Sequence, residues 1–240
     1  MNINRVDRYS FVEANTVEKI TPVNVSIDKK KLNVIIYKVI KRIIDIIGGL
    51  VGTIVLIPLT IIIYIARKIL HEDDGPMFYE QLRIGKNGKI FKMYKYRSMV
   101  VGADEILKEY LAENEEARKE YKEYKKLKND PRVTKVGDFI RKTSIDEFPQ
   151  FINVLKGEMS LVGPRPYLPR EKEDMGEFYT YIIQSKPGIT GYWQIAGRSD
   201  VTFEDRLKMD YDYNQNKNLK IDLKLLIKTV LNVVKKEGAI

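Results

Sequence analysis

Two adjacent carboxylates, Asp146 and Glu147, stand out in a chain that otherwise carries excess positive charge. They lie in the stretch TSIDEFPQ, with Pro149 close behind. Ser144 precedes Glu147 by three residues, a spacing that predicts a capping box at the start of a helix. The first turn of a helix favours acidic side chains, and it is also a place where phosphate groups bind. The pair is therefore either a helix start alone or a helix start to which chemistry has been added.

The composition limits the chemistry that this pair can serve. The 240 residues include no cysteine and a single histidine, His71. Disulfides, thiolate metal sites and cysteine nucleophiles are excluded, and histidine-rich zinc sites or histidine-based triads are not expected. Acid–base, nucleophilic or metal chemistry then falls on carboxylates, lysine, tyrosine or hydroxyl groups. The net charge of +9 favours an anionic partner: nucleic acid, a membrane surface or a phosphorylated small molecule.

Basic side chains flank the acidic pair in several motifs, although each alone is typical of a surface charge. KMYKYRSM supplies Lys95 and Arg97, which alternation can place on one face of a strand. RKTSIDE supplies Arg141, and GPRP holds Arg165 between two prolines that restrict its backbone. A rigid arginine in a loop suits bidentate phosphate recognition. A phosphoanhydride substrate, whose oxygens must be neutralised before a nucleophile approaches phosphorus, fits this set of residues.

An apolar segment over residues 46–66 must be placed together with these motifs, and it carries no charge over 21 positions. As a helix it would be about 31 Å long, enough to cross the hydrocarbon core of a bilayer. Basic residues lie on both sides of it: Lys38, Lys41 and Arg42 before, Arg67 and Lys68 after. This pattern favours both ends on the cytoplasmic side of a membrane.

Pro58, inside the apolar segment, removes a helical donor and can bend the helix sharply. Such a bend would let the chain enter and leave the bilayer by the same face, with Thr53 and Thr60 satisfying carbonyls that the proline frees. An ordinary kinked span is the alternative, self-associating through Gly48 and Gly52 at small-xxx-small spacing. The basic flanks favour re-entry.

Asp45, at the edge of the apolar segment, is costly in or near a bilayer unless it is paired. Arg42 lies three residues earlier and can reach it on a helix. Together with Lys41, these residues would lie at the depth of the lipid headgroups. Their role would be either to anchor the helix or to hold a lipid phosphate.

The whole sequence predicts an α+β fold in which a re-entrant membrane helix precedes a small, helix-rich domain with interfacial amphipathic helices. We assign a polar N-terminal arm to residues 1–33, the re-entrant helix to 34–70 and a cytoplasmic domain to 71–240, which the family resemblance described below implies to be catalytic. Residues 219–236 form a basic amphipathic helix that suits either a membrane surface or packing on the core.

Three further patterns describe the catalytic domain. GKNGK, residues 85–89, predicts a hairpin turn between two short strands. The charged residues 103–128 predict one long, solvated helix. Two loops rich in glycine and proline, 162–166 and 186–199, would let the backbone approach a ligand closely, or are simply turns.

These motifs together resemble the bacterial sugar transferases, the monotopic phosphoglycosyl transferases that begin polyprenyl-linked glycan synthesis. The resemblance rests on KRIIDI, the proline in the apolar segment, YKYRSM, the stretch from DPRVTK to GPRP, and KPGITGYWQIAGRS, in consistent order over about residues 36–235. The last loop and the tail after it are most similar to enzymes that start exopolysaccharide, capsule or O-antigen units. Many of those carry an additional block of N-terminal membrane helices, so the resemblance suggests a minimal catalytic form.

By this resemblance Asp146 is a nucleophile that attacks the sugar-linked phosphorus of a UDP-sugar. UMP leaves, and the phosphosugar passes from the aspartate to polyprenyl (undecaprenyl) phosphate in a ping-pong reaction. Asp146 and Glu147 would bind Mg²⁺. The residues implied to hold phosphates are Lys95, Arg97, Arg141, Arg165 and Arg198. Near a helix start, we expect the pKa of Asp146 to be low.

The resemblance also implies attachment to the bacterial inner (cytoplasmic) membrane, with the catalytic domain on the cytoplasmic face. It leaves a homodimer open, and the sequence has no nucleic-acid-binding motif. A non-catalytic, membrane-tethered scaffold that binds anionic lipid is the alternative. That alternative explains the charge and the apolar segment, but not the acidic pair or the prolines around Arg165.

Overall fold

The computed structural model describes residues 29–124, 127–196 and 201–235. In chain order its helices and strands are α1 (Lys29–Ile69), β1 (Phe78–Ile84), β2 (Ile90–Tyr96), α2 (Ala103–Glu113), α3 (Glu115–Tyr124), α4 (Lys135–Lys142), α5 (Gln150–Lys156), β3 (Ser160–Val162), α6 (Phe178–Ile182), β4 (Gly188–Thr190), α7 (Tyr192–Ala196), α8 (Phe203–Asn216) and α9 (Leu219–Lys235). Short 3₁₀ turns are η1 (Lys86–Gly88), η2 (Ile145–Glu147) and η3 (Pro169–Glu171). This mixture of helices and small sheets confirms the α+β class.

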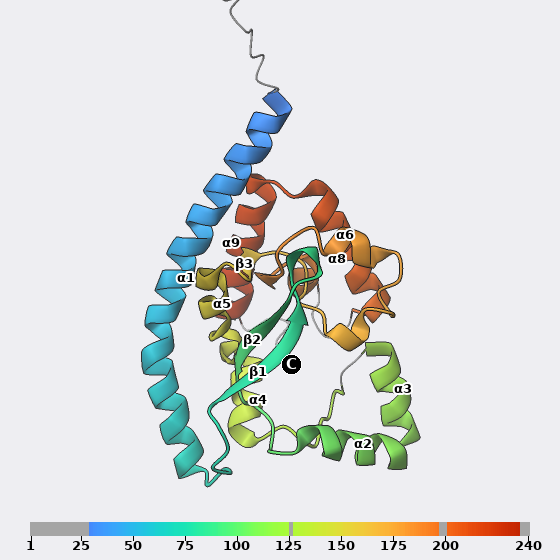
Figure 1. Ribbon diagram of the computed structural model, residues 1–240. Helices are drawn as coiled ribbons and strands as arrows, with labels where there is room; N and C mark the ends of the chain where they lie inside the picture. The colour runs from blue at the N-terminus through green and yellow to red at the C-terminus, as the bar shows by residue number, and fades with distance from the viewer. Residues whose placement is uncertain (1–28, 125–126, 197–200, 236–240) are drawn as a thin grey trace, which may run out of the picture.

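The helix α1 runs along one side of the molecule, with the other elements packed against one of its faces (Figure 1). Its residues Lys31–Ile69 are long and apolar enough to cross a membrane. Pro58 lies inside α1 without ending it, and the helix changes direction about midway along its length (Figure 1). The face turned away from the domain exposes large apolar side chains such as Ile54 and Ile57, which are 60% and 65% exposed.

The threonines near Pro58 bond to α1's own backbone. The hydroxyl of Thr53 donates to the carbonyl of Gly49 at 2.8 Å, and that of Thr60 donates to the carbonyl of Leu56 at 2.8 Å. The predicted hydroxyl-to-carbonyl bonds therefore form, but they satisfy carbonyls on either side of the one that the proline frees, four residues before it.

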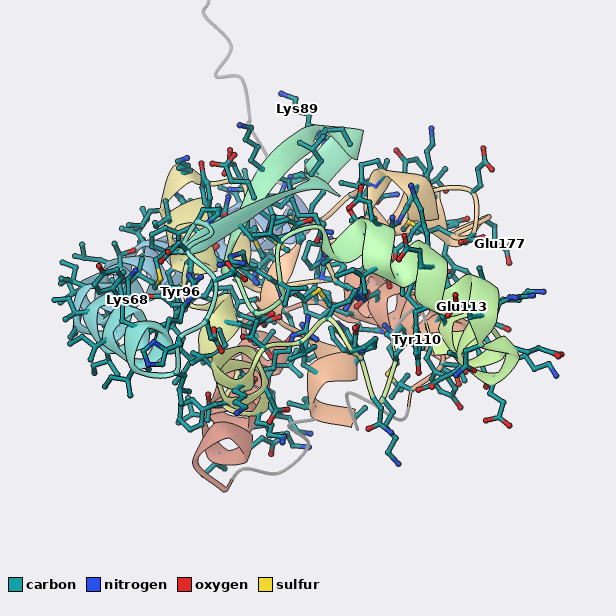
Figure 2. All side chains as sticks on the ribbon, turned by 90° about the horizontal axis from the view of Figure 1, so that it is seen from below. Lys68, Lys89, Tyr96, Tyr110, Glu113 and Glu177 are labelled. Atoms are coloured by element: carbon teal, nitrogen blue, oxygen red, sulfur yellow. The ribbon has the colours of Figure 1, made fainter. Side chains whose placement is uncertain are left out.

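Tyr96, the last residue of β2, fastens this strand to α1. Its hydroxyl lies 2.6 Å from Oγ1 of Thr60 and 3.2 Å from the carbonyl of Leu56, within hydrogen-bond distance of both. Figure 2, seen from below, shows Tyr96 beside α1 and Tyr110 on the opposite side of the molecule. A buried phenol of this kind needs a partner, and here the membrane-type helix supplies both of its partners.

The small residues of α1 face the domain. A Cβ atom on Gly48 would lie 2.5 Å from Cδ1 of Leu161, and one on Gly52 would lie 2.2 Å from Cγ of Phe151. Glycine is needed at both positions because the neighbouring side chains fill the space that a Cβ would take. Self-association of helices through Gly48 and Gly52 is therefore wrong, since the chain's own domain covers this face.

The predicted hairpin is confirmed. β1 and β2 pair antiparallel from Phe78 opposite Tyr96 to Ile84 opposite Ile90. Asn87 and Gly88 in η1 both have positive φ, 57° and 76°, as a tight hairpin turn requires. One face of the hairpin packs on α5, where Met93 and Val154 are fully buried in the main core cluster.

The two glycine- and proline-rich loops meet each other. β3 and β4 pair in parallel, and the chain continues with Gly163 N–H donating to the carbonyl of Thr190 at 2.9 Å. A Cβ on Gly188 would lie 2.1 Å from the backbone nitrogen of Gly163. These glycines do allow a close backbone approach, as expected, but the approach is of one loop to the other.

The prediction of one long helix over 103–128 is wrong. α2 ends and α3 begins at Asn114, which has extended backbone angles and whose Oδ1 accepts from the N–H of Ala117 at 2.9 Å. Asparagine is a favoured helix cap because its short side chain competes with the helical hydrogen-bond ladder. α2 and α3 form a bent arm at one edge of the molecule (Figure 1).

α9 packs on the core, one of the two expectations for the C-terminal amphipathic helix, while contact with a membrane surface stays a prediction. Leu225 and Asp222 are buried against the domain. The opposite face exposes apolar side chains: Leu223, Ile227, Val230 and Leu231. Core packing therefore uses one face, and the other presents an apolar stripe.

Candidate active site

The acidic pair lies in η2, the 3₁₀ turn between α4 and α5. Ser144 has φ 57° and makes no side-chain cap, and α5 begins only at Gln150. The predicted capping box is therefore wrong. The left-handed residue reverses the chain at the end of α4, so that Asp146 points inward and is 8% exposed.

Lys95 of β2 joins both carboxylates. Its Nζ lies 3.3 Å from Oδ2 of Asp146 and 2.9 Å from Oε1 of Glu147. The Asp146 side chain is 11% exposed and that of Glu147 is 35% exposed. One carboxylate is therefore buried and shielded, while its neighbour reaches solvent.

Burial raises the pKa of Asp146, an effect that Lys95 opposes and Glu147 reinforces. The expected low pKa is wrong because no helix start supports this carboxylate and because its burial disfavours the charged form. Burial alone would lower the pKa of Lys95, but Glu147 and Asp146 outweigh it and raise that pKa. The ammonium therefore stays charged beside the pair.

A hollow of about 300 Å³ opens beside Lys95 and Glu147. It is bounded by the inner face of the hairpin, η2, the loop after β3, and α7. Its polar lining residues are Arg83, Lys95, Glu147, Gln150, Arg165, Trp193 and Gln194. Glu147 and three cations, Arg83, Lys95 and Arg165, thus line one open hollow, and Asp146 lies behind Lys95.

Arg165 is held in this hollow by its backbone. Its N–H donates to Oδ2 of Asp210 at 2.9 Å, and the hydroxyl of Tyr167 donates to the same oxygen at 2.7 Å. The guanidinium lies over the ring of Trp193 at 5.1 Å, and its buried Nε has no hydrogen-bond partner. A fixed, buried donor without a partner is suited to a ligand.

Arg83 is a site residue that the sequence interpretation missed. Its position opposite Phe91 in the hairpin places it on the same strand face as Lys95. It is 7% exposed, donates to the carbonyl of Pro166 at 2.8 Å, and keeps a buried Nε without a partner. Burial and the nearby Arg165 lower its pKa to about 9. Only the hairpin register, together with this burial, distinguishes it from a surface arginine.

Comparison with known proteins decides the family. The profile of the bacterial sugar transferases matches residues 36–236. This chain belongs to the bacterial sugar transferase family. The family assignment from the sequence motifs is therefore confirmed.

Among relatives in this family, an undecaprenyl-phosphate galactose phosphotransferase of Salmonella typhimurium is 46% identical over 200 residues, covering 83% of this chain and 41% of that protein. The exopolysaccharide production protein ExoY of Rhizobium meliloti is 41% identical over 199 residues, covering 83% of this chain and 87% of that protein. A UDP-glucose:undecaprenyl-phosphate glucose-1-phosphate transferase of Escherichia coli is 36% identical over 202 residues, covering 80% of this chain and 40% of that protein. This sugar transferase thus spans about two fifths of the length of the first and third.

Arg97 and Arg141, two further cations of the predicted phosphate set, lie outside the lining of the hollow. Arg97 forms a two-pronged ion pair with Asp73, with distances of 2.5 and 3.0 Å, and donates from Nε to the carbonyl of Pro76 at 2.8 Å. It therefore fixes the connection after α1. Arg141 donates from Nε to Ser98 at 2.9 Å. Burial lowers the pKa of Arg141, and Asp146 is the first of the groups that oppose this shift. Arg198 lies outside the described residues.

The predicted pair of Arg42 and Asp45 is replaced by separate contacts to the domain. The Arg42 guanidinium donates to the carbonyls of Val154 and Leu155 at 2.8 and 2.9 Å, at the C-terminal end of α5. Asp45 accepts instead from Oγ of Ser160 at 2.9 Å and from the backbone of β3. Open carbonyls at a helix end attract such donors, and these contacts outcompete an ion pair within α1.

Lys41 also turns to the domain. Its Nζ lies 2.7 Å from Oδ2 of Asp222 and donates to the carbonyl of Val162 at 2.9 Å. We call Lys41, Arg42 and Asp45, with their partners, the docking seam. Since these side chains are paired within the protein, the seam anchors α1 to the elements that follow it.

The carboxylates available for a metal are Asp146 and Glu147. Within the described residues, no cluster of three or more histidine, cysteine, aspartate or glutamate side chains could hold a metal ion by itself. Mg²⁺ is commonly bound through one or two carboxylates together with substrate phosphates. Two carboxylates at the edge of a hollow lined by cations fit that arrangement.

Proposed function

We propose that this sugar transferase moves a sugar-1-phosphate from a UDP-sugar to polyprenyl (undecaprenyl) phosphate, a first membrane step of exopolysaccharide, capsule or O-antigen synthesis. The observation that carries the proposal is the buried Asp146 carboxylate, held by Lys95 beside a hollow whose arginines keep partnerless donors. The activities for which the Salmonella and Escherichia relatives are named support the same reaction class.

In the first step an oxygen of Asp146 attacks the sugar-linked phosphorus of the UDP-sugar. A bond forms between that oxygen and phosphorus, the anhydride bond breaks, and UMP leaves with its electron pair. In the second step a phosphate oxygen of polyprenyl phosphate attacks the same phosphorus. The bond to Asp146 breaks, giving polyprenyl diphosphate-sugar and the restored carboxylate.

The charged side chains in and beside the hollow have different roles in binding and positioning the reacting groups. Lys95 holds Asp146 and Glu147 in place and remains charged beside the attacked phosphorus. Arg83 and Arg165 present fixed, buried donors to phosphate oxygens, and burial strengthens such interactions. Asp146 and Glu147 would hold Mg²⁺, which offsets the repulsion between carboxylate and phosphate when bound.

We further propose a re-entrant, monotopic placement of α1, with the catalytic domain on the cytoplasmic face. Contacts from the domain to α1 extend from Arg42 at one end, through Gly52 and Thr60, to Arg67 at the other. A straight crossing would pull this polar domain into the hydrocarbon core, at great cost. Basic residues at both ends of the apolar segment favour the same placement.

Release of UMP from a panel of UDP-sugars, with Mg²⁺ and polyprenyl phosphate, tests the proposal. We expect turnover with one or a few sugars, and mass spectrometry of the protein incubated with donor alone should find the phosphosugar on Asp146. An adduct on another residue would refute the assigned nucleophile. Absence of UMP release across the panel would favour the scaffold alternative.

A further inference from the structure

Three lysines from separate connections meet near the N-terminal half of α1: Lys86 in η1, Lys186 before β4 and Lys217 after α8. The backbone N–H of Asn87 donates to the carbonyl of Ile183 at 2.7 Å, which joins the hairpin turn to the segment that carries Lys186. Nζ of Lys217 donates to Oγ of Ser185 at 2.7 Å, next to Lys186 in the chain. We call these three residues the lysine cluster.

The lysine cluster has no acidic partner. Within the described residues, none of its three side chains forms an ion pair, and Lys217 donates to neutral groups of Ser185 and Asn214. More positive charge adjoins it, since a Cβ on Gly157 would lie 3.4 Å from Nζ of Lys186 and 3.5 Å from Nη2 of Arg42. The attraction of Asp45 for Lys186 and of Asp222 for Lys217 offsets only part of the repulsion among these cations.

The nearby carboxylates are already committed. Asp45 and Asp222 are buried in the docking seam, where they accept from Ser160 and Lys41. Burial, followed by Lys86 and the lysines of α1, lowers the pKa of Lys217 to about 8. Burial and the adjacent Arg42 also lower the pKa of Lys186. An anion bound among these groups would relieve the strain that both shifts reflect.

We propose that the lysine cluster binds the phosphate of an anionic lipid headgroup, at a site separate from the hollow beside Asp146. Arg42, which adjoins the cluster, lies one turn before the uncharged stretch of α1 that begins at Ile46. The free face of α1 at this level exposes Val39 and Ile43, which are 53% and 51% exposed. Basic residues beside such an interfacial stretch attract anionic lipid. The proposal rests on the proposed membrane association of α1, not on the reaction.

Lysine acetylation, read by mass spectrometry, tests the site without substrate. The full chain in neutral detergent is labelled alone, with short-chain phosphatidylglycerol, with short-chain phosphatidylcholine, and with inorganic phosphate. We expect phosphatidylglycerol to slow acetylation of Lys186 and Lys217, while Lys108 and Lys122 on the α2–α3 arm react as before. No protection, or equal protection by inorganic phosphate or phosphatidylcholine, would overturn a site for anionic lipid.

Matched variants separate a site from general charge. Lys86→Gln removes an exposed side chain and should weaken the protecting effect of phosphatidylglycerol at Lys186 and Lys217 about fivefold, since each such charge contributes about 1 kcal/mol. The control K108Q/K122Q/K128Q removes three exposed lysines elsewhere and should leave the protection unchanged. Equal loss in both variants would show that net charge alone attracts the lipid.

Failure of this proposal and failure of the proposed reaction are distinguishable. Asp146→Asn lacks the reacting carboxylate but keeps every residue of the lysine cluster. We expect this variant to be protected by phosphatidylglycerol as the unmodified chain is, even when it releases no UMP. Loss of protection in Asp146→Asn would place the lipid in the catalytic hollow and overturn the separate site.

Discussion

The docking seam and the hollow beside Asp146 use the same kinds of side chain, but they satisfy them differently. In the seam, Arg42 and Asp45 each make two hydrogen bonds to the domain. In the hollow, Arg83 and Arg165 each keep a buried Nε without a partner. A buried donor left unpaired costs about 1–3 kcal/mol, a cost that a bound ligand can remove. Completeness of partners therefore distinguishes the charges of the seam, which hold the fold together, from the two arginines of the hollow, which keep donors for a ligand.

The strongest test of this contrast is Asp146→Asn. Loss of the nucleophile should lower UMP release by about 10⁴-fold or more. Thermal unfolding at neutral pH should occur at the same temperature or a higher one, because asparagine avoids the burial of a charge and Lys95 keeps Glu147. Retained turnover would contradict the assignment of Asp146 as the nucleophile. A lower unfolding temperature would contradict the idea that the buried carboxylate costs stability.

Asp210, which lies under Arg165, gives the next largest effect, through pH. Burial raises its pKa from 3.8 to about 7, although the Arg165 N–H and the Tyr167 hydroxyl oppose that shift. Because the folded pKa exceeds the unfolded one, the stabilising contribution is complete below about pH 4 and is lost as the pH rises to about 7. In Asp210→Asn this part of the pH dependence, a few kcal/mol at most, should vanish. Urea unfolding at several pH values measures it, and an unchanged profile would contradict the assignment.

Arg83→Met tests whether the partnerless donor serves a ligand. We expect kcat/KM to fall about 10²-fold, with unfolding unchanged or shifted to higher temperature, because an apolar side chain of similar length removes a buried charge. Arg83→Lys is the matched control: it keeps the charge but loses the planar donors, and should recover only part of the activity. If Arg83→Met lost stability but kept its kcat/KM in the folded fraction, the role of Arg83 would be structural, like that of the docking seam.

Asp45→Ala should give the smallest effect of these variants. Its effect should also be of the opposite kind, because stability falls while activity is kept. Removing the carboxylate leaves the donors of Ser160 and Leu161 buried and unpaired, and should lower the free energy of unfolding by about 2 kcal/mol. UMP release per folded molecule should stay within about twofold of the unmodified chain. Activity and unfolding measured on the same preparation would show it, and a selective loss of activity would move Asp45 into the chemistry.

Local patterns predicted the parts of this molecule that depend on neighbouring residues. The hairpin, the apolar helix and the α+β class follow from turn residues and hydrophobic periodicity, and Lys95 does lie beside Asp146 and Glu147. The break at Asn114 also has a local cause, because its side chain caps the next helix, but the charge pattern on either side concealed it.

Contacts between distant segments account for the predictions that failed. Arg42 and Asp45 look like a pair at helical spacing, but β3 and α5 supply better partners from more than a hundred residues away. The pKa of Asp146 is raised rather than lowered, because the effect of burial outweighs that of the positive charge on Lys95. Arg83 carries no motif of its own, and its burial beside Arg165 appears only when the strands are paired.

The bond between Tyr96 and Thr60 has a practical consequence for protein engineering. Lys95 precedes Tyr96 in β2, so a truncated protein without α1 would release the strand end that positions Lys95 beside Asp146. A version that is soluble without detergent and can be crystallised is better obtained by replacing outward isoleucines of α1 with polar residues. Examples are Ile54, Ile57 and Ile61. The inward face of the helix would be unchanged and would continue to support β2 and the elements packed on it.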